Sequence, residues 1–114
     1  MNVPRCLFCG RGPVEWHHVT GRRVRDGAYL DPLLVVPLCK RHHDREEELL
    51  RRGGLEFLPP GADPVGHRLA RLLDLIGRCA DNGCQLVLSP DALRALHALL
   101  LEAARRCDET EGVA

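Results

Sequence analysis

Two pairs of metal-binding side chains with matching spacing lie in the first half of the chain. Cys6 and Cys9 are separated by two residues, and Cys39 and His42 repeat that spacing further along. Two such pairs supply the four ligands that a tetrahedral structural Zn2+ requires. The cysteines could instead form disulfides or core thiols, and His43 could replace His42 as the fourth ligand. We expect Cys6, Cys9, Cys39 and His42 to hold a structural zinc, because so short a chain builds only a thin core.

A second group of candidate ligands surrounds this framework. Residues 15–18 read Glu-Trp-His-His, and His43 directly follows the second pair. Adjacent residues of a strand point to opposite faces, so His17 and His18 cannot share one role. One strand histidine and His43 could hold a second, catalytic ion, whereas an exposed polar pair is the simpler alternative. Glu15 lies on the same strand face as His17, where it could hydrogen-bond to His17, join the metal or form a surface ion pair.

These motifs together resemble the HNH endonuclease family, whose nuclease unit is a ββα-metal core. The resemblance covers about residues 3–48. It rests on the CxxC motif, the EWHHV string at Glu15–Val19, the Gly21-Arg22 pair and the VPLCKRHH string at Val36–His43. In that family the first residue of the histidine pair binds the catalytic ion, the second is the general base, and the last histidine binds the ion again. The resemblance therefore implies metal binding by His17 and His43, general-base catalysis by His18, and the same four structural zinc ligands.

One position departs from the family pattern. Leu34 stands where the family normally has an asparagine that braces the loop of the ribbon, and Asp31 could brace the loop instead. We interpret the chain as a metal-dependent DNA endonuclease or nickase. The alternative is a non-catalytic zinc-stabilised module that binds nucleic acid or a protein partner, for example an assembly factor of a phage or mobile element. Retention of all three histidines favours catalysis, because a binding module has no need of His18.

Phosphodiester hydrolysis requires an activated water and positive charge facing the phosphate. Neutral His18 can accept a proton from water near pH 7. Arg22, Arg23 and Arg25 are expected to contact DNA phosphates, although a solvated loop is an equally good interpretation. The candidate catalytic ions are Mg2+, Mn2+, Ni2+, Co2+ and Zn2+. Two imidazole ligands favour the transition metals over Mg2+.

The elements that must position these residues belong to an α+β fold. We expect strands at Glu15–Val19 and Leu33–Pro37, followed by a helix over Lys40–Arg52 that ends at two glycines. The Leu-Pro-Pro-Gly segment at 58–61 marks a break. The predicted organisation is a zinc-stapled ββα-metal nuclease core at residues 1–53, a linker at 54–61 and a helical accessory region at 62–114.

The second half has the pattern of two helices. Asp63 and Pro64 are expected to open the first helix, and Ser89 and Pro90 the second, which runs to about Arg106. The expected apolar stripes are Leu69, Leu72, Leu73 and Ile76, then Leu93, Leu96, Leu100 and Leu101. Such stripes form a small hydrophobic core or pair with a second copy or a larger protein partner. The remaining cysteines, Cys79, Cys84 and Cys107, are expected to be core thiols rather than a further metal site.

Charge and hydropathy narrow the class of protein. The chain has 114 residues, with 16 basic and 16 acidic side chains. Residues 1–53 contain ten basic and seven acidic groups, so the first half is the better partner for DNA. The neutral total argues for a partner that supplies further DNA affinity. We expect a cytoplasmic protein without membrane contact, because no apolar run reaches spanning length and the N-terminal residues do not resemble a signal peptide.

Overall fold

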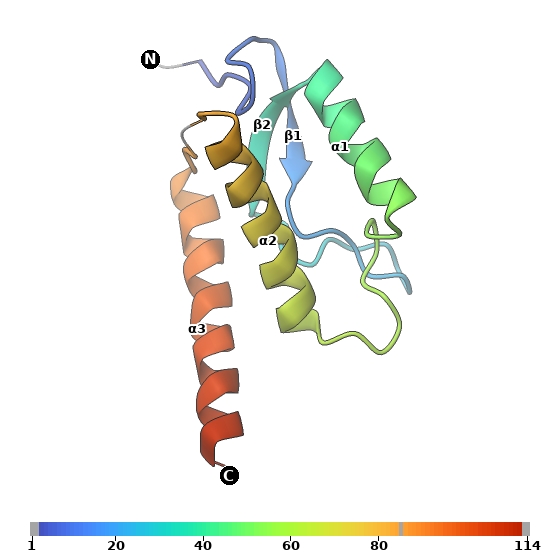
Figure 1. The fold of residues 1–114 in the computed structure, drawn as a ribbon, viewed down its shortest axis with the longest axis vertical. Helices are drawn as coiled ribbons and strands as arrows, with labels where there is room; N and C mark the ends of the chain where they lie inside the picture. Colours follow the sequence, from blue (N-terminus) through green and yellow to red (C-terminus); the bar gives the residue numbers. More distant parts are fainter. Residues whose placement is uncertain (1–2, 85, 113–114) are drawn as a thin grey trace.

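The computed structural model describes residues 3–84 and 86–112 and has an α+β fold (Figure 1). In chain order, its elements are β1 (Val14–His18), β2 (Val35–Cys39), α1 (Lys40–Arg52), α2 (Pro64–Asp81) and α3 (Pro90–Gly112). The α+β class predicted from the sequence is confirmed. None of the described helices is both long enough and apolar enough to span a membrane.

The two strands form an antiparallel ribbon. Val14 pairs with Cys39 and His18 with Val35, so the strand that carries His17 and His18 lies beside the strand that ends at Cys39. The observed strands begin one residue earlier and two residues later than predicted, respectively. β2 runs directly into α1, because Cys39 is both the last strand residue and the N-cap of the helix.

Sequence signals set the bounds of the helices. α1 spans Lys40–Arg52, as predicted, and the chain leaves it through two glycines, of which Gly54 has a positive φ of 67°. The Asp63 carboxylate accepts a hydrogen bond from Val65 N at 3.3 Å, and Ser89 accepts one from Ala92 N at 3.1 Å. These side chains satisfy free N–H groups at the starts of α2 and α3. α3 continues to Gly112, beyond the predicted end.

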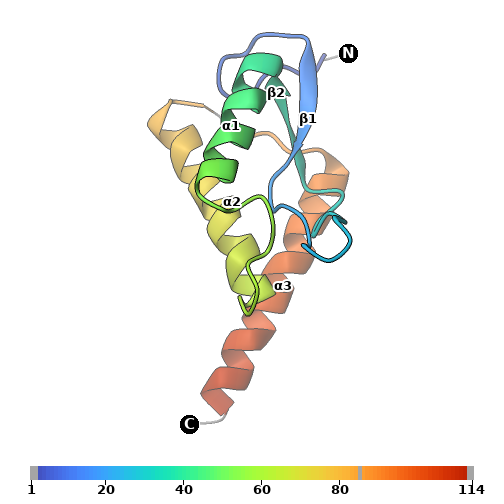
Figure 2. The same cartoon turned by 90° about the vertical axis from the view of Figure 1, so that its right-hand side faces the viewer.

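One hydrophobic core joins the two halves of the chain. Its buried members are Cys6, Val19, Leu34, Val36 and Leu38 from the first half and Leu72, Leu75, Cys79, Ala92 and Leu99 from the second. Figure 2 shows α1 alongside the strands and α3 extending away from them toward the C-terminus. The helical half therefore covers apolar side chains that the strands and their connecting loop leave open.

The predicted apolar stripes were partly wrong. On α2, Leu72 is buried, but Leu73 is 63% exposed, and Val65, Leu75 and Cys79 complete the buried face. On α3, Ala92 and Leu99 are buried, whereas Leu93, Leu100 and Leu101 are about half exposed. Both helices carry more leucines than one face can hold, so periodicity alone cannot identify the leucines that face the core.

The segment predicted as a linker lies against the loop that follows β1. Arg22 N donates a hydrogen bond to Glu56 O at 3.1 Å, and Leu58 N donates one to Arg22 O at 2.8 Å. These two bonds hold residues 56–58 beside Arg22 in a short parallel bridge. The segment thus brings α2 back against the strands.

Adjacent leucines on α2 provide a test of this packing. Leu72→Ala is expected to lower the free energy of unfolding by about 2–5 kcal/mol, because it leaves a cavity in the shared core. Leu73→Ala removes the same atoms from an exposed site and should change the free energy of unfolding by less than about 1 kcal/mol. Urea denaturation followed by circular dichroism measures both variants. Equal losses would contradict the assigned buried face.

Candidate metal centres and the adjoining pocket

Cys6, Cys9, Cys39 and His42 meet at one point. Cys9 Sγ lies 3.8 Å from Cys39 Sγ, and His42 Nδ1 lies 3.2 Å from Cys39 Sγ and 3.4 Å from Cys6 Sγ. All four ligand atoms lie within 4.8 Å of one another. A tetrahedral zinc with bonds of about 2.0–2.3 Å separates its ligand atoms by roughly 3.5–3.8 Å. The Cys3His cluster could therefore hold a metal such as zinc.

Local backbone geometry builds this cluster. After Cys6 the chain turns tightly, with Gly10 N donating to Cys6 O at 2.8 Å and Gly10 at a φ of 71°. Leu7 N donates to Pro37 O at 2.9 Å, which holds the turn against β2. Cys39 ends that strand and His42 lies in the first turn of α1. The two knuckles predicted from spacing are thus brought together by the strand pairing.

The cluster also resolves two alternatives left by the sequence. All six cysteines are free thiols in the structure, so Cys6, Cys9 and Cys39 are not paired as disulfides. His42, not His43, joins the cysteines. Burial raises the pKa of the Cys6 thiol, but backbone hydrogen bonds involving Cys39, Cys9 and Phe8 outweigh it and lower that pKa to about 6. The thiolate, which is the form that binds metal, is thereby favoured.

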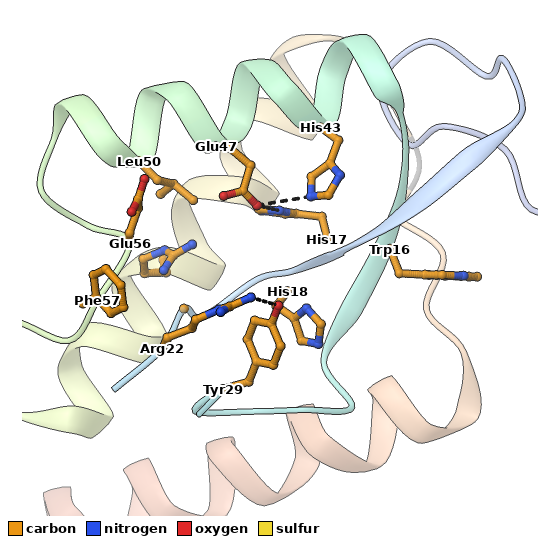
Figure 3. A pocket seen from close by; sticks show the side chains of 12 residues that line it. Trp16, His17, His18, Arg22, Tyr29, His43, Glu47, Leu50, Glu56 and Phe57 are labelled. Atoms are coloured by element: carbon orange, nitrogen blue, oxygen red, sulfur yellow. Dashed lines mark hydrogen bonds and ion pairs between the residues drawn. The ribbon is translucent and has the colours of Figure 1, made fainter. Parts of the chain in front are cut away.

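A second group of possible ligands comprises His17, His43 and Glu47 (Figure 3). Glu47 Oε1 lies 3.2 Å from His43 Nε2 and 3.6 Å from His17 Nδ1. These separations are close to the roughly 3.0–3.4 Å between ligand atoms of an ion with bonds of about 2.1 Å. The pKa of Glu47 is lowered, first by its contact with His17 and also by His43, so its carboxylate is held in the ionised form.

His17 shows why this cluster fits a metal ion. Its side chain is only 4% exposed, and its Nδ1 atom has no hydrogen-bond partner among the described residues. A buried polar atom without a partner costs about 1–3 kcal/mol. An ion placed between His17, His43 and Glu47 would satisfy that nitrogen. The donor set of two imidazoles and one carboxylate is one that divalent metals use in proteins.

Glu15 and Glu47 correct the site expected from the sequence. Glu15 Oε1 lies 2.8 Å from His43 Nδ1, so its partner is the helix histidine rather than His17. This contact orients His43 so that Nε2 faces the cluster. Glu47 was not predicted, although it follows His43 by four residues and therefore lies on the same face of α1. That spacing was the available signal, but a run of three glutamates obscured it.

His18 lies beside the cluster in a different environment. Its ring stacks on Tyr29, with centroids 3.4 Å apart and planes 5° apart. Arg22 also contacts Tyr29. Its guanidinium carbon lies over the Tyr29 ring, 4.2 Å from the centroid, and the guanidinium donates a hydrogen bond to the Tyr29 hydroxyl (Figure 3). Burial is the main cause that lowers the pKa of His18, and electrostatic interaction with His17 and Arg22 adds to the effect. Its neutral form, which can accept a proton, therefore predominates at neutral pH.

These side chains line one pocket of about 370 Å³. The pocket includes His17, His18, Arg22 and His43 among the residues predicted for the site. Its other lining residues are Trp16, Gly21, Tyr29, Glu47, Leu50, Glu56, Phe57 and Arg71. Two further loop arginines lie elsewhere: Arg23 pairs with Asp26 at 3.0 Å, and Arg25 is exposed outside the pocket lining.

Leu34 and Asp31 have separate roles in the loop between the strands. Leu34 is fully buried in the hydrophobic core. Asp31 is buried and accepts hydrogen bonds from Thr20 Oγ1 at 2.6 Å and from Arg68 at 2.6 and 2.9 Å. The carboxylate thus braces the loop, as the sequence suggested.

The three remaining cysteines belong to neither cluster. Cys79 is buried, and desolvation raises its pKa to about 11, which suits a core thiol. Cys84 is partly buried, whereas Cys107 is exposed and does not fit the predicted core position.

Substitution of one cluster cysteine tests the metal centre. Cys9→Ser is expected to lose the bound metal and to unfold at a much lower temperature, since structural zinc contributes about 10 kcal/mol or more to such folds. Cys9 is exposed, so lost packing cannot account for a large effect. Cys107→Ser, also at an exposed thiol, is the matched control and should keep both properties. Elemental analysis measures the zinc content of each variant, and thermal melts measure its unfolding temperature. A Cys9→Ser protein with full zinc content would contradict the assignment of Cys9 as a zinc ligand.

Comparisons with known proteins give no match. No family model matches the chain, and neither the curated proteins nor the solved structures include one that is significantly similar. The function must therefore be inferred from the residues of the site and their geometry.

Proposed function

We propose that this chain is a metal-dependent DNA endonuclease or nickase of the HNH type. The observation that carries the proposal is the cluster of His17, His43 and Glu47, in which the buried Nδ1 of His17 makes no hydrogen bond to the described residues and lies 3.6 Å from the Glu47 carboxylate. His18, held in its neutral form, lines the same pocket. Metal ligands next to a proton acceptor form the arrangement that hydrolysis of a phosphodiester requires.

The Cys3His cluster is proposed to bind a structural zinc. Zinc at Cys6, Cys9, Cys39 and His42 would join the N-terminal turn to the end of β2 and the first turn of α1. His42 and His43 are consecutive residues of that turn. Zinc in the Cys3His cluster would therefore also help to hold the His43 ring near His17 of β1, 5.4 Å away between ring centroids.

Each residue of the pocket has a distinct proposed role. His17, His43 and Glu47 would hold a divalent ion, with Glu15 orienting the His43 ring. When bound, such an ion supplies Lewis-acid stabilisation of the charge that develops on the phosphate. His18 would accept a proton from the attacking water, and its stacking on Tyr29 restricts the orientation of the imidazole.

Positive charge in the loop supports a nucleic-acid substrate. Arg22 lines the pocket, and its hydrogen bond to Tyr29 fixes the guanidinium near His18. Arg23 and Arg25 are exposed in the same loop, where they could contact flanking phosphates. Of the three arginines, Arg22 is the one whose position favours contact with the reacting group.

A second candidate function is a non-catalytic zinc module with a protein partner. It is favoured by the half-exposed Leu93, Leu100 and Leu101 on α3, which a second copy or a larger protein could cover. An assembly factor of a phage or mobile element would have this character. The two functions differ in their need for His18, because a binding module requires no proton acceptor in the pocket.

Plasmid nicking by the His18→Ala variant is the direct test. We expect the wild-type protein to nick supercoiled DNA with at least one of Mg2+, Mn2+, Ni2+ and Zn2+. His18→Ala should bind both metals and lose roughly 10²–10⁴-fold in rate, which is the usual contribution of a general base. His97→Ala, at an exposed histidine on α3, is the control and should nick normally. Wild-type rates in the His18→Ala protein would exclude the proposed base.

Neighbouring glutamates on α1 separate metal binding from surface charge. Glu47→Gln should weaken Ni2+ or Mn2+ binding at the second centre by at least tenfold, because a neutral amide replaces a charged ligand. Glu48→Gln changes the next residue, which pairs with Arg51 and Arg52, and should leave the affinity unchanged. Isothermal titration calorimetry measures the Ni2+ or Mn2+ affinity of both variants, with zinc supplied only for the Cys3His cluster. Equal affinities in the two variants would remove Glu47 from the site.

A further inference from the structure

Arg71 of α2 is a buried cation that faces the same pocket. The residue is 8% exposed and lines the pocket together with His17, His18 and Glu47. Its only hydrogen bond within the described chain runs from Nη1 to Leu55 O at 2.9 Å. No carboxylate of the described residues lies within ion-pair distance of its guanidinium. An arginine offers five N–H donors, so most of the hydrogen-bonding capacity of Arg71 is left for another group.

The neighbouring arginines of α2 show that this arrangement is unusual. Arg68 pairs with Asp31 and Glu102, and Arg78 pairs with Glu46 and Asp74. These contacts raise the pKa of Arg68 and Arg78, whereas burial lowers the pKa of Arg71. Glu47, Glu46 and Asp74 are near enough to attract the charge of Arg71, but none of them pairs with it directly. A buried charge without a direct partner is costly, and a bound anion would supply that partner.

The loop after β1 leaves room for this side chain. Gly21 has a φ of 89°, and a Cβ atom built at this position would overlap Arg71 Nη1. Glycine therefore serves two purposes here, because it permits the turn and allows the guanidinium to approach the backbone. A side chain at position 21 would push Arg71 out of its place beside the pocket.

The charges of the pocket indicate the kind of ligand. Arg22 and Arg71 are balanced by Glu47 and Glu56, so the charged side chains of the lining cancel. A divalent ion between His17, His43 and Glu47 would add two positive charges. The metal-loaded pocket would then attract an anion, and a guanidinium matches the geometry of phosphate oxygens.

We propose that Arg71 binds a non-bridging oxygen of the substrate phosphodiester beside the second metal centre. The inference rests on the proposed function for the identity of the anion as a phosphodiester. The helical half of the chain would then contribute a substrate-binding residue to a pocket otherwise built by β1, α1 and their loops. Residues 62–112 would be required for phosphate binding as well as for covering the core.

Phosphate binding can be measured without cleavage. Inorganic phosphate is titrated into full-length protein loaded with Zn2+, and affinity is followed by calorimetry. Arg71→Met is expected to weaken binding roughly 10-fold to 100-fold, the usual effect of losing hydrogen bonds to a charged group. Arg71→Lys, which keeps the charge without the planar fork, should give a smaller loss. Arg78→Met is the matched control on the same helix; it should lower stability but leave phosphate affinity unchanged.

A second measurement uses the wild-type protein, so it does not depend on a variant that folds. The side-chain Nε–H resonance of Arg71 should shift during the phosphate titration, while that of Arg78 stays in place. If the Arg71 signal does not move, or if zinc-loaded Arg71→Met binds phosphate as tightly as wild type, the inference is wrong.

Cleavage assays then separate this inference from the proposed function. Phosphate binding that depends on Arg71, in a protein that cuts no DNA, would support the anion site and contradict the nuclease. DNA nicking at the wild-type rate by Arg71→Met would support the nuclease and overturn the role of Arg71.

Discussion

The buried ion pair between Asp31 and Arg68 holds the strand loop against the helical half. Both oxygens of Asp31 accept bonds from one guanidinium, Thr20 donates to the same carboxylate, and Arg68 also reaches Glu102 on α3. Removing one partner of such a pair typically costs 3–5 kcal/mol, because a charge is left buried alone. The loop, α2 and α3 are therefore fixed relative to one another, and the position of Arg71 one turn along α2 follows from this arrangement.

The backbone of Asp31 also closes the loop that follows β1. Leu34 N donates to Asp31 O at 3.1 Å, and Val19 N donates to Leu34 O at 3.1 Å, so the loop closes immediately after His18. A side-chain brace on Asp31 frees position 34 for an apolar residue. Leu34 then packs between the strands and the helices α2 and α3.

Local patterns in the sequence predicted the candidate metal ligands better than they predicted which helix residues are buried. Spacing located Cys6, Cys9, Cys39 and His42, because each pair belongs to one turn and strand pairing joins the turns. The bounds of α1 were also predictable, since glycine ends it. The position of Arg71 beside the pocket was not predictable, because it depends on how α2 packs and no local sequence motif indicates that packing. Leu72 and Leu73 are equally apolar, so only the tertiary structure decides which of them is buried.

Because β2 passes directly into α1, the two clusters share one rigid stretch of backbone. Cys39, His42 and His43 lie within five consecutive residues, and no flexible connection separates the ligands of one cluster from those of the other. An ion bound at either cluster would reduce the motion of this turn and lower the entropic cost of ordering the other. Thermodynamic linkage makes the effect reciprocal, so an ion held by His17, His43 and Glu47 would tighten ion binding at the Cys3His cluster by the same factor.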